Sequence, residues 1–151
     1  MQLSSFLNKK ALQPNLRSTT KDEVLDELVS LIEQTGQVVD REEFLQVINE
    51  REQLGSTGIG YNIAIPHARS KAIKSLTGAF AISKQGVDFD ALDKEPVNLF
   101  FLLGAPEDAS GDYLKALAII SRFLRRKKAR QDLMNADTVA AIQEIIQREG
   151  L

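Results

Sequence analysis

His67 is the only histidine of the chain, and it ends a segment rich in glycine and hydroxyl side chains. These small residues cluster over residues 55–60, an apolar stretch follows, and Pro66 precedes the histidine. An imidazole nitrogen is a nucleophile, and the backbone N–H groups of a glycine-rich turn can receive an anion. Arg51 and Arg69, one on each side of the segment, supply positive charge. Together these residues predict a site where a nitrogen of His67 meets an anionic group.

The same residues admit other interpretations. A lone histidine is often hydrogen-bonded at the end of a strand for structural reasons alone. Zinc would need mostly carboxylate ligands here, because the chain has no cysteine and no second histidine. Ser56 or Ser70 could in principle serve a hydrolase with His67, but no nucleophile elbow is present. We therefore expect neither a metal nor a cofactor.

The glycines do not form a nucleotide-binding motif. Residues 58–63 lack the third glycine of a dinucleotide fingerprint and lead into Pro66, where that motif requires the start of a helix. They also lack the Gly-Lys-Ser/Thr ending of a P-loop. The sequence therefore does not support ATP binding.

The composition favours one ordinary globular domain over residues 1–151. Hydrophobic residues make up 43% of the 151 residues and charged residues 26%, which is a typical globular balance. The formal net charge of -2 gives no general attraction to nucleic acid. The longest apolar stretch, residues 97–103, is too short to span a bilayer, and the first residues lack a leader pattern. We expect a cytoplasmic protein without membrane insertion and without a nucleic-acid partner.

Helix signals dominate the first third of the chain. Thr20 and Glu23 form a capping box, after which apolar residues recur at helical spacing until Gly36. Asp40 can cap a second helix that ends near Gly55.

The second of these helices would lead directly into the histidine segment. Arg51 is expected in its last turn, and residues 56–61 are expected to form a loop. Residues 62–65 then predict a short buried strand, which Pro66 ends because proline cannot donate to a strand ladder. His67 would therefore be presented at the edge of that strand.

The second half of the chain predicts strands followed by helices. Two short strands, 76–83 and 87–90, would be joined by a turn at residues 85–86. The nearly continuous apolar run 97–103 predicts a central strand covered on both faces. A long amphipathic helix over residues 112–127 and a last helix from Asp137 to Gly150 would follow. The fold class predicted is α/β, a single three-layer domain with helices on both faces of a mixed central sheet whose strand order the patterns leave open.

The run from Arg51-Glu52 to His67 resembles the phosphorylation motif of enzyme IIA domains of the fructose/mannitol type, from the bacterial phosphoenolpyruvate-dependent phosphotransferase system. The likeness continues in residues 87–89 and 93–99 and so covers almost the whole chain. It implies an enzyme IIA phosphocarrier domain over residues 1–151 that forms a phosphohistidine intermediate without a metal or a nucleotide.

The resemblance also implies roles for individual residues. His67 would accept the phosphoryl group on Nε2, and the carrier HPr or its nitrogen-related paralogue would donate it. Arg51 would lie over the transferring group, and Arg69 would be a weaker second cation. Ser56 and Thr57, with nearby backbone N–H groups, would receive the phosphoryl oxygens.

Two features favour the nitrogen-regulatory branch of this family, in which phosphorylation changes the binding of regulated target proteins. The opening Leu3–Leu7 resembles that branch. Sugar-transporting members often carry a second histidine where this chain has Tyr113, and a tyrosine hydroxyl can donate to a phosphoryl oxygen but carries no positive charge. The ring of Tyr113 could equally anchor its helix. The alternatives are a sugar-uptake enzyme IIA that donates to a separate enzyme IIB, and a binding module that is never phosphorylated.

Two surface features complete the sequence predictions. An apolar rim around His67 that includes Ile59, Tyr61 and Ile65 is expected to meet the donor transiently. The dense basic run from Arg122 to Arg130 is explained more readily by the negative end of a helix dipole than by a docking patch, and we assign it no partner.

Overall fold

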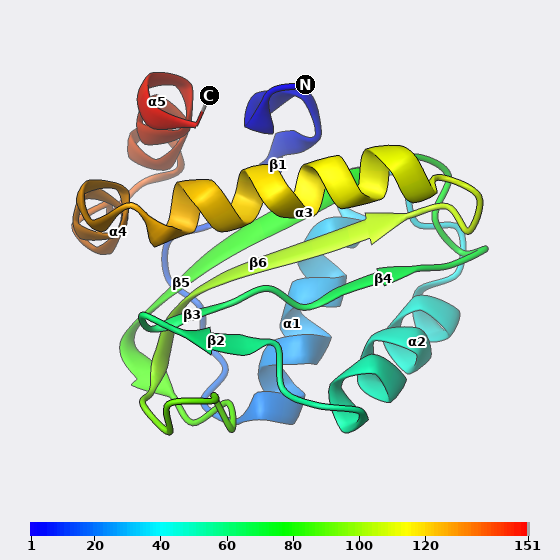
Figure 1. Cartoon of the computed structure of the whole chain (residues 1–151), viewed down its shortest axis with the longest axis horizontal. Helices are drawn as coiled ribbons and strands as arrows, with labels where there is room; N and C mark the ends of the chain where they lie inside the picture. The colour runs from blue at the N-terminus through cyan, green and yellow to red at the C-terminus, as the bar shows by residue number, and fades with distance from the viewer. Residues whose placement is uncertain (151) are drawn as a thin grey trace.

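The computed structural model describes residues 1–150, which form a mixed sheet with helices on both of its faces (Figure 1). The predicted three-layer α/β class is therefore confirmed. The strand order is β1-β5-β6-β3-β2, and β4 continues the pairing with β6 beyond β3. The strands are β1 (Leu7–Gln13), β2 (Gly58–Gly60), β3 (Ile63–Ala64), β4 (His67–Arg69), β5 (Thr77–Val87) and β6 (Val97–Ala105).

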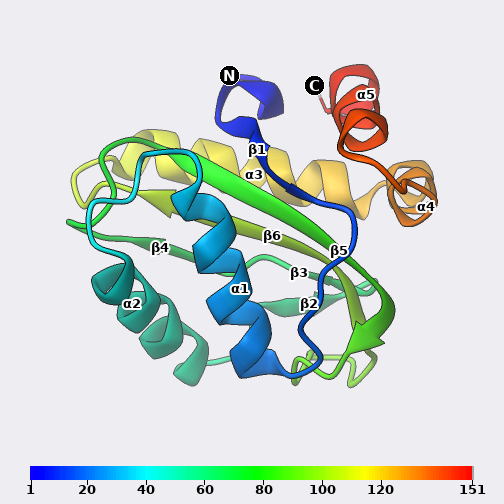
Figure 2. The ribbon, with the colours of Figure 1, turned by 180° about the vertical axis from the view of Figure 1, so that it is seen from behind.

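The helices divide between the two faces of the sheet. Figure 2 shows α1 and α2 on one face, and Figure 1 shows α3 crossing the other with α4 and α5 beyond its end. None of the helices within residues 1–150 combines the length and the apolar character needed to cross a membrane. The α-helices are α1 (Lys21–Glu33), α2 (Arg41–Gln53), α3 (Ser110–Arg125), α4 (Lys127–Met134) and α5 (Val139–Glu149), and a 3-10 turn, η1 (Leu3–Ser5), precedes β1.

Strand β6 lies at the centre of the sheet, as its apolar sequence predicts. Phe100 and Leu102 pack into the core beneath α1 and α2. Leu99, Phe101 and Leu103 pack into the opposite core beneath α3, α4 and α5. Because successive side chains of a strand point to opposite faces, a strand covered on both faces is apolar at nearly every position.

The first two helices begin where the sequence indicates. The Thr20 hydroxyl accepts a hydrogen bond from the N–H of Glu23 at 3.3 Å, and the Asp40 carboxylate accepts one from the N–H of Glu43 at 3.1 Å. Each cap satisfies a backbone donor that has no partner within the first turn. Helix α2 ends at Gln53, so Arg51 lies in its last turn, as predicted.

The prediction of two short strands joined by a turn at residues 85–86 is wrong. Residues Thr77–Val87 form one strand, β5, whose pairing with β6 shifts register between Ile82 and Val87. Gly86, at φ +83°, bends the strand without reversing it. The edge strand β1 was not predicted, and it pairs in parallel with β5.

The helical boundaries also differ from the prediction in the last third of the chain. The long helix ends at Arg125, and α4 follows it as a separate helix because Arg126 has extended backbone angles. The last helix is capped by Thr138 and not by Asp137: the Thr138 hydroxyl accepts from the N–H of Ala141 at 3.1 Å.

Residues 56–61, expected as a loop, include strand β2, which forms a hairpin with β3. Tyr61 and Asn62 connect the two strands with φ of 57° and 62°. A two-residue hairpin with both central residues at positive φ is a type I′ turn, whose twist matches that of the flanking strands. The hairpin gives the chain a fixed path toward His67.

Candidate functional site

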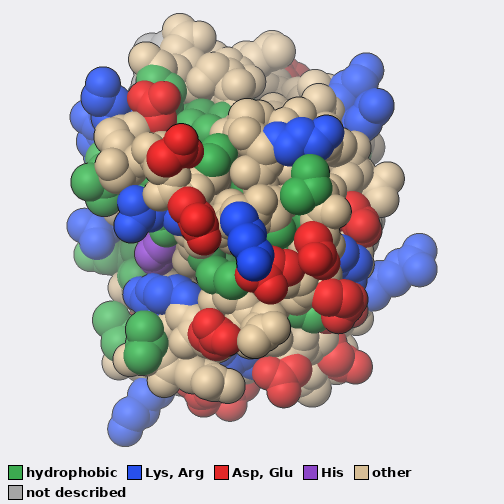
Figure 3. Space-filling view, turned by 90° about the vertical axis from the view of Figure 1, so that its right-hand side faces the viewer, with side chains coloured by type: hydrophobic (Ala, Val, Ile, Leu, Met, Phe, Trp, Pro, Cys, Tyr) green, Lys and Arg blue, Asp and Glu red, His purple; other side chains and the backbone are tan. Residues whose placement is uncertain are grey.

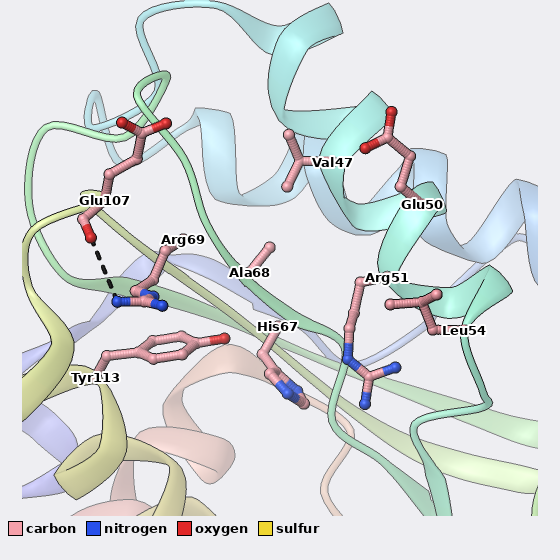
Figure 4. Close-up of a pocket in the computed structure, with 9 residues that line it drawn as sticks. All are labelled: Val47, Glu50, Arg51, Leu54, His67, Ala68, Arg69, Glu107 and Tyr113. Carbon is pink, nitrogen blue, oxygen red and sulfur yellow. Dashed lines mark hydrogen bonds between the residues drawn. The ribbon is translucent and has the colours of Figure 1, made fainter.

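A pocket of about 680 Å³ opens where the end of α2, strand β4 and the start of α3 meet. Figure 4 shows the side chains that border it, and Figure 3 shows the histidine at the surface among basic and hydrophobic side chains. The lining residues are Val47, Glu50, Arg51, Leu54, His67, Ala68, Arg69, Glu107 and Tyr113. Four sequence-predicted site residues, His67, Arg51, Arg69 and Tyr113, therefore come together here.

His67 is the first residue of β4 and pairs with Leu103 of β6. Its Nδ1 lies 2.6 Å from the carbonyl oxygen of Ile65. A carbonyl oxygen can only accept a hydrogen bond, so in the neutral ring this contact requires the proton to be on Nδ1. Nε2 is then left with its lone pair. Pro66 separates the two residues and breaks the strand between β3 and β4, which lets the ring turn back onto the Ile65 carbonyl.

The environment of His67 lowers its pKa below the ordinary value of 6.5. Burial is the main cause, and the positive charge of Arg51 acts in the same direction. The hydrogen bond to Ile65 and the negative charge of Glu52 act against it. The net effect favours the neutral ring, which is the nucleophilic form, at neutral pH.

Arg51 reaches the pocket from the last turn of α2. Its Nη1 donates a hydrogen bond to the carbonyl oxygen of Gly55 at 2.9 Å, which ties the guanidinium to the loop that follows the helix. Within residues 1–150 no carboxylate forms a salt bridge with Arg51, whereas eleven such contacts occur elsewhere. Figure 4 shows the Arg51 side chain next to His67, so its positive charge remains available to an anion that binds there.

Tyr113 and Arg69 form the opposite side of the pocket. The ring centroids of Tyr113 and His67 are 6.1 Å apart, and the Arg69 guanidinium carbon lies 5.6 Å from the Tyr113 ring centroid. Arg69 also donates to the carbonyl oxygen of Glu107 at 3.4 Å. In Figure 4 the Tyr113 hydroxyl points toward His67. Burial raises the pKa of Tyr113 above 10.0, so the hydroxyl stays a neutral donor.

Ser56 and Thr57, which were expected to receive an anion, are not among the residues that line the pocket, and their hydroxyls are bonded within the protein. The Ser56 hydroxyl donates to the carbonyl oxygen of Phe89 at 2.8 Å and accepts from the N–H of Gly58 at 3.0 Å. Thr57 is 3% exposed, and both its hydroxyl and its N–H donate to the Glu52 carboxylate. Both residues hold the loop in place.

The apolar rim of the pocket also differs from the sequence prediction. Leu54 and Val47 line it from α2, and Leu54 is 85% exposed. Ile65 is buried, and Tyr61 lies under Arg130 at another part of the surface. Leu54 could have been found from the sequence, because it is a large apolar residue just after the end of an amphipathic helix.

The basic run from Arg122 to Arg130 spans the junction of α3 and α4. Arg130 donates to the carbonyl oxygens of Leu124 and Arg125, and Arg126 donates to that of Glu149. These contacts satisfy carbonyl groups at the ends of helices α3 and α5, which agrees with the helix-end explanation of the run.

The pocket offers a nucleophilic nitrogen beside two guanidinium groups and a hydroxyl donor. Within residues 1–150, His, Cys, Asp and Glu side chains form no group of three or more that could hold a metal ion. The arrangement is suited to receiving a tetrahedral anion on His67.

Comparison with known proteins gives concordant results. Residues 5–149 match the family model described as phosphoenolpyruvate-dependent sugar phosphotransferase system, EIIA 2. The chain is 36% identical over 147 residues to a nitrogen regulatory protein of Bradyrhizobium diazoefficiens, covering 97% of this chain and 95% of that protein. It is 38% identical over 146 residues to the fructose-specific EIIABC component of Bacillus subtilis, covering 97% of this chain but only 23% of that protein.

A solved structure shows the same fold at a similar level of identity. The crystal structure of the nitrogen regulatory protein IIA-Ntr from Neisseria meningitidis matches with a TM-score of 0.88 and 30% identity. The match covers 95% of this chain and 98% of that one.

Proposed function

The chain belongs to the EIIA 2 family of the phosphoenolpyruvate-dependent sugar phosphotransferase system, and we propose that it is a phosphocarrier whose acceptor atom is Nε2 of His67. The contact that carries the proposal is the 2.6 Å hydrogen bond between Nδ1 and the Ile65 carbonyl oxygen. Because Nδ1 holds the proton, Nε2 has the lone pair that an electrophilic phosphorus requires.

The transfer needs no change of protonation before attack. The Nε2 lone pair forms a bond to the phosphorus of a phosphohistidine on the donor protein while the donor's P–N bond breaks, and that electron pair returns to the donor nitrogen. The proton on Nδ1 stays in place, so the phosphorylated ring carries a positive charge next to the Ile65 carbonyl oxygen. Phosphoryl transfer depends mainly on alignment and on stabilising the equatorial oxygens.

Arg51 supplies the main charge stabilisation in this proposal. Its guanidinium has no carboxylate partner within the described residues and lies beside the imidazole (Figure 4). Tyr113 donates its hydroxyl to a phosphoryl oxygen from the opposite side, and Arg69 keeps the tyrosine ring in place. Phosphorylation would add a phosphoryl group of about -2 charge to a ring that becomes positive, so the pocket, which is lined by two arginines and two glutamates, would become more negative by about one charge.

The donor in this proposal is HPr or its nitrogen-related paralogue, and the chain acts as a regulatory enzyme IIA. Three observations support the regulatory role. The nitrogen regulatory protein of Bradyrhizobium diazoefficiens is similar over 95% of its length, and IIA-Ntr shares the fold. Tyr113 occupies a position beside His67 where a second histidine would be expected in a sugar-transporting member. The change of charge in the pocket would then alter which target proteins bind.

A sugar-uptake enzyme IIA that passes phosphate to a separate enzyme IIB is the second candidate. The similarity to the fructose-specific EIIABC component, which this chain matches over 23% of that protein, favours it. A binding module that is never phosphorylated is disfavoured, because Nε2 of His67 is free and Arg51 is unpaired within the described chain.

The test is reconstitution of the transfer. The protein is incubated with phosphoenolpyruvate, enzyme I and HPr or the nitrogen-related HPr, and the product is examined for an acid-labile adduct by mass spectrometry. The adduct should form on the wild-type chain and be absent from His67→Gln. Addition of candidate enzyme IIB proteins should leave the adduct intact if the chain is a regulatory endpoint, and should discharge it if the chain serves sugar uptake. No adduct on the wild-type chain would support the binding module.

A further inference from the structure

Glu52 is a buried carboxylate directly after Arg51, and its role is not explained by the pocket. Arg51 borders the pocket, but Glu52 is only 7% exposed and does not line it; together with Lys21 and Asp90 it borders a separate hollow beside α1 and α2. Its carboxylate lies 3.0 Å from Nζ of Lys21, the first residue of α1. The Lys21 ammonium also lies 4.7 Å from the centroid of the Phe89 ring. A buried carboxylate is costly unless it is paired and hydrogen-bonded, and Glu52 is both.

The second partner of Glu52 is Thr57, two residues after Gly55. The backbone N–H of Thr57 donates to both carboxylate oxygens at 3.3 Å, and the Thr57 hydroxyl donates to Oε1. Because the carboxylate engages the main chain as well as the side chain, it fixes the position of the Thr57 peptide and not merely the rotamer of the threonine.

The backbone of Thr57 is in turn linked to His67 through Ile65, which lies between β3 and β4. The carbonyl oxygen of Thr57 accepts a hydrogen bond from the N–H of Ile65 at 3.0 Å. The carbonyl oxygen of Ile65 faces Nδ1 of His67 at 2.6 Å. A continuous series of contacts therefore runs from Lys21 through Glu52, Thr57 and Ile65 to the imidazole.

From this series we infer that Glu52, held by Lys21, is a positioning residue for His67. It fixes the Thr57 and Ile65 peptides so that the Ile65 carbonyl oxygen retains the proton on Nδ1 and leaves Nε2 as the attacking nitrogen. The inference rests on the proposed phosphocarrier function for its kinetic consequence, but the effect on the ring exists in the unphosphorylated protein. A buried acid that orients a histidine through hydrogen bonds is a recurrent device, and here the backbone of two residues, Thr57 and Ile65, lies between the acid and the ring.

The charged and titratable groups around His67 come from three elements. Glu50, Arg51 and Glu52 lie on α2, Arg69 lies on β4 with the histidine, and Glu107 and Tyr113 lie just before and within α3. Arg51 disfavours the protonated ring and Glu52 favours it. Removing the charge of Glu52 should therefore lower the pKa of His67, an effect that a purely structural role of Glu52 does not predict.

Because His67 is the only histidine, ¹⁵N labelling of histidine gives the signals of one ring. The tautomer and the pKa of His67 are measured by NMR in the unphosphorylated protein, and the rate of phosphoryl uptake from phosphorylated HPr is measured over a pH series. The variants are Glu52→Gln, which keeps an acceptor but removes the charge, and the double variant Lys21→Met/Glu52→Met, which removes both charges and the acceptor. Glu42→Gln, at an exposed site of the same helix, is the matched control.

The inference predicts separate effects for the two variants. Glu52→Gln lowers the pKa of His67, and the double variant moves the ring toward a mixture of tautomers and slows phosphoryl uptake by at least about tenfold. Glu42→Gln leaves all three readouts unchanged. Thr57→Val removes only the hydroxyl contact and should change the tautomer less than the double variant does.

The results that would overturn the inference are distinct from those that would overturn the proposed function. If the tautomer and the pKa are the same in Glu52→Gln, in the double variant and in the wild type, Glu52 does not position the ring. If a variant fails to fold by circular dichroism, Thr57→Val provides the decisive ring measurement, and an unchanged tautomer there counts against the inference. If the wild-type chain takes up no phosphate, the phosphocarrier function fails while the NMR measurements still decide the role of Glu52.

Discussion

The Arg69 guanidinium lies over the ring of Tyr113, 5.6 Å from its centroid, and that ring is 6.1 Å from the ring of His67. The tyrosine is therefore held between a cation and the proposed acceptor. Burial raises its pKa, so its hydroxyl remains a donor throughout the physiological pH range. In the proposed transfer, we expect this hydroxyl to act where a second histidine is absent.

Replacement of Tyr113 tests the donor role of its hydroxyl. Tyr113→Phe should slow phosphoryl uptake several-fold, because a neutral hydrogen bond contributes about 0.5 to 1.5 kcal/mol, and it should leave the thermal midpoint nearly unchanged. Initial rates from phosphorylated HPr provide the measurement. An unchanged rate would assign the ring an anchoring role only.

Tyr113→His restores the group that the resemblance leads one to expect at this position. The new imidazole should add a second ionisation to the pH profile of uptake, because histidine titrates near neutral pH and tyrosine does not. The wild-type profile should reflect a single histidine. A second ionisation near neutral pH in the wild-type chain would show that another group controls the transfer.

Arg51→Ala should remove the main charge stabilisation of the transferring group. We expect a loss of about 1.5 to 3 kcal/mol of transition-state stabilisation, which corresponds to a roughly ten- to hundredfold slower uptake. The fold should persist, because among residues 1–150 the Arg51 side chain makes a single hydrogen bond, its contact with the Gly55 carbonyl oxygen.

Arg51→Lys separates the charge from the geometry of the guanidinium. Lysine keeps the positive charge but lacks the planar fork, so its rate should lie between those of wild type and Arg51→Ala. Rapid-quench measurement of the phosphorylated product gives all three rates. Equal rates for the alanine variant and the wild type would exclude Arg51 from the transfer.

The sequence could predict that His67 and Arg51 lie close together because local rules place both. The Asp40 cap starts α2, the helix length puts Arg51 in the last turn, and Pro66 ends the strand before His67. The orientation of Thr57 could not be predicted in this way. It depends on a buried carboxylate whose partner, Lys21, comes from another helix.

The errors in the fold prediction also arise from contacts between segments that are far apart in the sequence. A glycine at positive φ can either reverse a strand or bend it, and Gly86 bends β5 because β6 continues to pair on the other side of the irregularity. Strand β1 contains Asn8, Lys9 and Lys10, which obscure its pattern because it lies at the edge of the sheet. Pairing between segments far apart in the sequence therefore decides both the path of β5 past Gly86 and the formation of β1.

Stability should depend on pH through His67. Burial and Arg51 lower its pKa in the folded protein below the ordinary value of 6.5, so the unfolded chain binds more protons below that pH. The contribution of the neutral ring is therefore fully present above pH 6.5 and is lost as the pH falls through the lowered pKa. The measurement is the urea unfolding free energy at a series of pH values between 7.5 and 5.

The variant His67→Gln isolates this contribution from the titration of the carboxylates. The difference in unfolding free energy between wild type and variant should shrink as the pH is lowered, because glutamine does not bind a proton. A difference that grows on acidification would mean that the folded state favours the protonated ring, which would contradict the direction of the shift.

A pair of glycine substitutions tests the packing beneath the site. At Gly78 in β5 a Cβ atom would lie 2.7 Å from Cε1 of Phe101, a ring that is fully buried and packed between Phe6 and Phe80. The ring has no free space to move into, so Gly78→Ala should destabilise the fold by about 1 to 3 kcal/mol. Gly111→Ala in α3 is the control, because nothing lies within 4 Å of its Cβ, and it should stabilise the helix by up to about 1 kcal/mol. Urea unfolding of both variants gives the comparison, and a Gly78→Ala protein as stable as Gly111→Ala would show that the Phe101 ring can move aside.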